Sequence, residues 1–180
     1  MVLIILSVPN ILDLPMFQSI RKVLILAAAS LTGVITLPAN AQTPGWIPVA
    51  ELLIGSMGNS NYHQMVEVMN RCTALNMTLS ALTAKDSPEV SQGYENQALT
   101  LIQNGIMIEM NTETALTGLE PDIDDLSGKA VDAVKGMLAT YNQWMDENYD
   151  DSGSYFSNDL EIEMKGCELA TKFVVQMSAR

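Results

Sequence analysis

Apolar residues recur through the middle of the chain in alternating steps of three and four positions. Between residues 61 and 84 one such series of apolar positions is Met65, Val68, Cys72, Leu75, Leu79 and Leu82. An α-helix turns once in about 3.6 residues, so this spacing places all six side chains on one face. The pattern therefore predicts an amphipathic helix over residues 61–84.

Three further segments, residues 88–116, 121–148 and 158–178, have the same spacing. Their apolar positions are Leu99, Ile102, Ile106 and Met110; Val131, Val134, Leu138, Tyr141 and Met145; and Leu160, Met164, Cys167, Thr171 and Val174. No segment shows the alternation of a convincing strand, and residues 48–54 predict a short additional helix. We expect an all-α domain over residues 42–180, an antiparallel up-down-up-down four-helix bundle with a short N-terminal helix.

The two cysteines lie on the apolar faces of the first and last long helices. Cys72 and Cys167 are the only cysteines in the chain, and each is near the middle of its predicted helix. In an up-down-up-down bundle the first and fourth helices are antiparallel neighbours, so their midpoints meet. We therefore predict a Cys72–Cys167 disulfide, the alternative being two buried free thiols.

Residues 1–41 have the order of a secretory signal peptide. A basic pair, Arg21 and Lys22, precedes an apolar run over residues 23–37, and Ala39 and Ala41 supply the small residues of a cleavage site. We expect cleavage after Ala41. Because residues 1–15 are interrupted by prolines and carry no basic residue, we also expect translation to start at Met16.

The alternative for this segment is a membrane anchor. The apolar run over residues 23–37 is 15 residues long, shorter than the roughly 20 residues that a spanning helix needs. The sequence therefore favours a cleaved signal, no membrane span in the mature chain, and a periplasmic or extracellular protein.

Cleavage makes an acidic chain more acidic. The whole sequence has a formal net charge of −12, and residues 42–180 carry 7 basic and 20 acidic residues, a net charge of −13. Such a charge disfavours binding to nucleic acid or anionic membranes and suits a cationic partner or a divalent cation.

Residues 148–159 resemble a twelve-residue calcium loop in part. Gly153 occupies the sixth position, where a sharp turn requires glycine, although Phe156 stands at the ninth. The candidate metal ligands, at positions one, three, five and twelve, are Asn148, Asp150, Ser152 and Asp159. The alternative is an acidic turn whose Ser157 or Asn158 caps the next helix.

Other chemistry has little support in the sequence. The single histidine, His63, together with Met65 and Met69 offers ligands that suit copper(I). Together with a more distant methionine, Met164 or Met177, it offers the two axial ligands of a haem. Because most methionines lie at core-forming positions, we interpret them as core residues.

The common nucleophile, phosphate-binding and metalloprotease motifs do not occur, so an enzyme is not favoured. We expect a non-catalytic module that binds a protein or a small-molecule partner and has no cofactor. Calcium binding through residues 148–159 is the alternative function.

Overall fold

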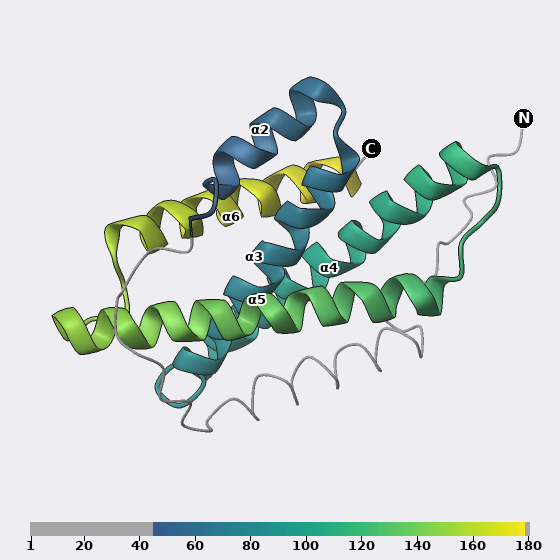
Figure 1. Ribbon diagram of the computed structural model, residues 1–180. Helices are drawn as coiled ribbons and strands as arrows, with labels where there is room; N and C mark the ends of the chain where they lie inside the picture. The colour runs from purple at the N-terminus through teal and green to yellow at the C-terminus, as the bar shows by residue number, and fades with distance from the viewer. Residues whose placement is uncertain (1–44, 179–180) are drawn as a thin grey trace, which may run out of the picture.

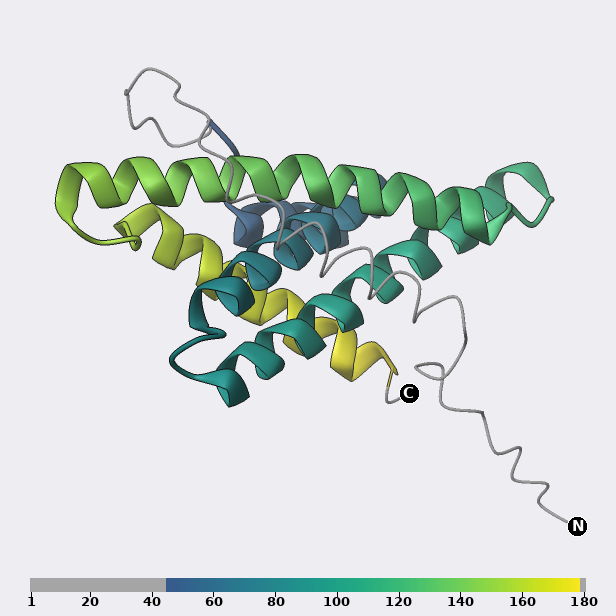
Figure 2. The ribbon, with the colours of Figure 1, turned by 90° about the horizontal axis from the view of Figure 1, so that it is seen from below.

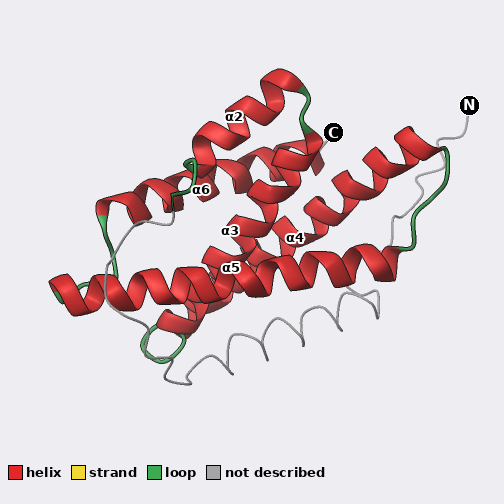
Figure 3. Ribbon diagram, in the orientation of Figure 1, coloured by secondary structure: helices red, strands yellow, loops and turns green. Residues whose placement is uncertain are grey.

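The computed structural model describes residues 45–178, and within this range the chain forms helices and no strand (Figures 1 and 3). The predicted signal peptide, its cleavage site and Met16 lie outside the described residues. The helices are α2 (Val49–Asn59), α3 (Tyr62–Thr83), α4 (Pro88–Thr117), α5 (Ile123–Ser152) and α6 (Asn158–Ser178). The four predicted long helices are confirmed, and the short N-terminal helix extends further than expected.

The ends of the helices follow from local side-chain chemistry. The side chain of Asn61 accepts a hydrogen bond from the Gln64 N–H at the start of α3, and Asp122 accepts one from the Asp124 N–H at the start of α5. Gly118 and Gly153 end α4 and α5 with φ of 73° and 71°. Glycine adopts this left-handed conformation without steric cost, so both helices stop where the sequence places it.

Helix α3 lies at the centre of the molecule. It contacts α2, α4, α5 and α6, and every residue from 68 to 79 is buried. Two of the buried polar side chains on α3 bond to their own helix: the Thr73 hydroxyl donates to the Met69 carbonyl at 2.8 Å and the Asn76 amide to the Cys72 carbonyl at 2.8 Å. Local bonds of this kind allow polar residues to be buried on all sides of a central helix.

The regular four-helix bundle is not confirmed. Helices α3 and α4 form a hairpin, α5 runs across this pair, and α6 diverges from α5 after their connecting turn (Figures 1 and 2). Helix α6 packs instead on α2, α3 and α4. The N-terminal helix, which contributes the buried Val49, Leu52 and Leu53, is therefore a full part of the core.

The predicted disulfide is confirmed. Cys72 and Cys167 are bonded, with 5.1 Å between their Cα atoms. Both cysteines are buried among apolar side chains. The bond joins the central helix to the last helix across 95 residues of chain.

No helix in residues 45–178 is long and apolar enough to span a membrane.

Candidate functional site: a pocket above a buried ion pair

A buried ion pair joins α3 to α6. The Arg71 guanidinium on α3 contacts the Glu163 carboxylate on α6 through Nη2 and Oε1, and each side chain is at most 5% exposed. The second guanidinium nitrogen, Nη1, donates to the carbonyl oxygen of Ile47 at 2.8 Å. Arg71 therefore also ties the segment that precedes α2 to the central helix.

Glu163 uses its second oxygen to cap α2. Pro48 stands at the cap position and its side chain makes no capping bond, but the Val49 N–H donates to Glu163 Oε2 at 3.1 Å. A carboxylate at a helix N-terminus is stabilised by the unpaired N–H groups and by the helix dipole. The last helix thus supplies the cap of the first described helix.

Tyr141 on α5 completes this network. Its hydroxyl donates to Glu163 Oε1 at 2.7 Å. Burial, followed by the nearby Glu163 charge, raises the pKa of Tyr141 well above its usual value of 10.0. The phenol therefore remains a protonated hydrogen-bond donor at physiological pH, and Glu163 receives bonds from three separate parts of the chain.

Aromatic rings cover the network. The Arg71 guanidinium carbon lies 4.7 Å from the centre of the Trp46 ring, a cation–π contact. Trp46 also meets Tyr141 edge-on, with 5.3 Å between ring centres. Tyr141 in turn stacks with Trp144 at 6.3 Å. This chain of rings fixes Trp46 and Trp144 on two sides of the ion pair.

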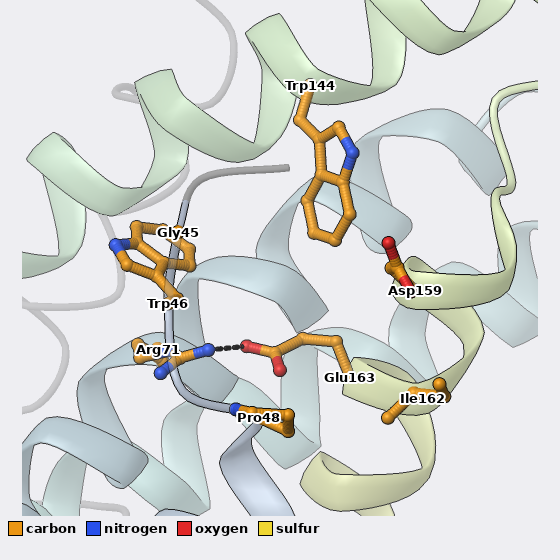
Figure 4. Close-up of a pocket in the computed structure, with 8 residues that line it drawn as sticks. All are labelled: Gly45, Trp46, Pro48, Arg71, Trp144, Asp159, Ile162 and Glu163. Carbon is orange, nitrogen blue, oxygen red and sulfur yellow. Dashed lines mark hydrogen bonds and ion pairs between the residues drawn. The ribbon is translucent and has the colours of Figure 1, made fainter. Parts of the chain in front are cut away.

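Between the two tryptophans lies a partly open pocket of about 210 Å³. Figure 4 shows Trp46 and Trp144 on different sides of it, Glu163 between them, and Asp159 on the α6 side. The residues that line the pocket are Gly45, Trp46, Pro48, Arg71, Trp144, Asp159, Ile162 and Glu163.

The lining of this pocket combines aromatic rings with charged side chains. Among the described residues that line it there is no serine, threonine, cysteine, histidine or lysine. The Glu163 carboxylate is engaged by Arg71, Tyr141 and the Val49 N–H. What remains is two indole rings and one exposed carboxylate, that of Asp159.

The four predicted calcium ligands lie in two different elements. Asn148, Asp150 and Ser152 belong to the last turns of α5, and Asp159 belongs to the first turn of α6. Helix positions two apart point in different directions, so Asp150 does not share a side of α5 with the other two. The Asn148 amide also donates to the Ser154 carbonyl at 3.0 Å. Calcium binding stays a prediction, and it would require the end of α5 to unwind.

The histidine and methionine alternatives are dispersed in the structure. His63 is exposed on the first turn of α3, whereas Met65 and Met69 are buried in the core. Met164 packs against the core and Met177 is exposed. Across residues 45–178 no three His, Cys, Asp or Glu side chains are grouped so that they could hold a metal ion.

The sequence reasoning missed Arg71 and did not assign a role to Glu163. One signal was present: Arg71 is the only charged residue between positions 68 and 84. Glu163 is another such signal, because it falls at a buried position in the same 3–4 spacing as Leu160 and Cys167. Opposite charges on the apolar faces of two helices joined by a disulfide could have predicted a buried pair.

Comparison of the chain with protein-family models, with curated proteins and with solved structures finds no match.

Proposed function

We propose that the protein is an exported, non-catalytic binding module and that the pocket between Trp46 and Trp144 is its binding site. The observation that carries the proposal is the pocket itself, which is open on one side and built on a floor fixed by four bonds to Glu163 and Arg71. Ligand sites combine apolar and aromatic walls with a few fixed polar groups, and this pocket has that composition.

Export is supported by the order of features in residues 1–41 and by the Cys72–Cys167 disulfide, since disulfides persist mainly in oxidising compartments. N-terminal sequencing of the protein recovered from outside the cytoplasm tests this part. We expect the mature chain to begin at Gln42. A large residue in place of Ala41 should leave the longer precursor, and a mature protein that keeps residues 16–41 would contradict the proposal.

The binding site has a built-in reporter. The chain contains two tryptophans, Trp46 and Trp144, and both line the pocket. Native mass spectrometry of the protein isolated from its own cells should show a co-purifying small molecule or partner. Adding that molecule back to protein from which it has been removed should change tryptophan emission. Unchanged emission would show that the molecule binds outside this pocket.

The alternative function, calcium binding through residues 148–159, has its own test. Because a site there needs the last turn of α5 to unwind, binding would raise the melting temperature and reduce helical circular dichroism. Because Asp150 does not share a side of α5 with Asn148 and Ser152, we expect millimolar calcium to change neither.

A further inference from the structure

The charge of the pocket distinguishes the ligands it can hold. Arg71 and Glu163 neutralise one another, whereas Asp159 forms no ion pair with any other residue of the range 45–178. The lining therefore carries one uncompensated negative charge. The surrounding chain is strongly acidic as well, with a net charge of −12, and such a field concentrates cations.

The hydrogen-bonding groups of the pocket also favour a cationic ligand. Ionised carboxylates only accept hydrogen bonds, and Pro48 has no N–H to donate. In Figure 4 the indole nitrogen of Trp46 lies on the side of its ring away from Glu163, and the six-membered ring of Trp144 points toward Glu163. Arg71, the remaining side-chain donor, is held through its two terminal nitrogens by Glu163 and the Ile47 carbonyl and contacts the Trp46 ring, while its buried Nε–H has no partner among the described residues. The pocket thus offers acceptors and ring surfaces to an incoming group.

An anion fits this arrangement poorly. To pair with the terminal guanidinium nitrogens of Arg71 it would have to displace the Glu163 carboxylate, which is at most 5% exposed, and it would approach both Glu163 and Asp159. A neutral apolar molecule could occupy the ring surfaces but would gain nothing from the charge of the exposed Asp159. A cation can pair with the Asp159 carboxylate and be attracted to the faces of the indole rings, of which the Trp46 ring already holds the Arg71 guanidinium.

The volume of the pocket limits the size of the group that it can hold. The pocket volume of about 210 Å³ is below the roughly 300–1,000 Å³ of typical small-molecule sites. This space accepts an alkylated ammonium group and a short carbon chain, and a larger molecule would place only one of its groups inside the partly open pocket.

We infer that the pocket binds a small organic cation, an alkylammonium group held against the rings of Trp46 and Trp144 with Asp159 as its counter-charge. This inference rests on the proposed function, since it names the class of ligand for the same pocket. The ammonium group can belong to a free amine or to the lysine side chain of a partner protein, and both present the same chemistry to the site.

Matched probe molecules test whether the pocket requires a positive charge on its ligand. Choline, its neutral carbon isostere dimethylbutanol, and propionate are titrated into the purified protein while tryptophan emission and binding heat are followed. We expect choline, or lysine capped as Nα-acetyl-lysine amide with its ε-ammonium free, to give saturable binding, at least tenfold tighter than dimethylbutanol, with no binding of propionate. Tighter binding of choline would indicate a free amine, and tighter binding of capped lysine a protein side chain.

Matched variants test the counter-charge. Asp159→Asn should weaken binding of the cation about fivefold, which is the effect of removing one exposed ion pair, and should leave the melting temperature nearly unchanged. Glu161→Gln is the control, because Glu161 is exposed on the same turn of α6 but does not line the pocket. It removes the same charge from the helix start and should leave affinity unchanged.

The outcomes separate the two proposals. If dimethylbutanol binds as tightly as choline, or if Asp159→Asn binds the cation as tightly as the original chain, the pocket remains a binding site and the cation inference is overturned. If neither these probes nor any molecule that co-purifies with the protein alters tryptophan emission, the pocket is not the binding site and both proposals fail.

Discussion

At the scale of single residues, Glu163 is the side chain on which most contacts converge. It neutralises Arg71, caps α2 through the Val49 N–H, and accepts the Tyr141 hydroxyl. A buried ion pair is costly to break on one side, because the remaining charge is left in a low-dielectric interior without a partner. The stability of this region therefore depends on Glu163 more than the value of any single bond suggests.

Glu163→Gln should lower the free energy of unfolding by about 3–5 kcal/mol, the cost of leaving a buried Arg71 charge unpaired. The exposed Glu161→Gln is the control and should change stability by at most about 0.5 kcal/mol. Urea denaturation measures both. Equal midpoints for the two variants would show that the pair contributes nothing to the fold.

Tyr141→Phe should destabilise the protein by about 1–3 kcal/mol at pH 7, because a bond to a charged acceptor is lost. Since burial raises the pKa of Tyr141 above its usual value of 10.0, the folded state keeps a proton that the unfolded state releases above that pH. The contribution of Tyr141 is thus complete below pH 10 and is lost as pH rises further. Denaturation at neutral and alkaline pH should show the gap between Tyr141→Phe and the original chain narrowing above pH 10, and a constant gap would contradict this.

At the scale of elements, the packing of α2 on α6 depends on the absence of one side chain. A Cβ atom at Gly166 would lie 2.9 Å from the Ala50 nitrogen and 3.0 Å from the Val49 Cβ atom. The first of these neighbours is backbone, which cannot rotate away as a side chain can. The two helices therefore approach each other closely only because residue 166 is glycine.

Gly166→Ala should destabilise the protein by about 1–3 kcal/mol through overpacking. Gly136→Ala on α5 is the matched control, because nothing lies within 4 Å of its added Cβ; there, alanine should stabilise the helix by about 0.5–1 kcal/mol. Opposite shifts in melting temperature are expected. A stabilised Gly166→Ala would show that α2 can move away from α6 without cost.

Sequence spacing predicted the helices well and their arrangement poorly, for a physical reason. Periodicity shows which face of a helix is buried, as it did for Val131, Val134 and Leu138, all of which are buried. It does not show which helix covers that face. Residues 49–59 are too short to assign a place in a bundle by pattern alone, so the packing of α2 on α6 was not foreseen. Because the pocket depends on that packing, the sequence did not predict the pocket either.

At the scale of the whole molecule, the Cys72–Cys167 bond joins the central helix to the last one. It closes a loop of 95 residues and so restricts the unfolded chain strongly. In the chain-entropy model a loop of this length contributes about 4–5 kcal/mol.

Cys72→Ala with Cys167→Ala should therefore lower the urea midpoint substantially, with a loss of up to about 4–5 kcal/mol. Reduction of the original chain under partly denaturing conditions should reproduce most of this loss. Alkylation without reductant should label neither thiol in the native protein. Full labelling of both cysteines would contradict the bond.

The cap that Glu163 provides to α2 also bears on the order in which the protein can be completed. A ribosome releases residues 49–59 before residues 158–178, yet the first described helix takes both its cap and one of its packing surfaces from the last described helix. Contacts between residues so distant in sequence form late, because a long loop must close before they are gained. A nascent chain that lacks its final twenty or so residues therefore has neither a complete pocket nor a complete core. The fold of residues 45–178 is completed only when the C-terminal helix packs against the others.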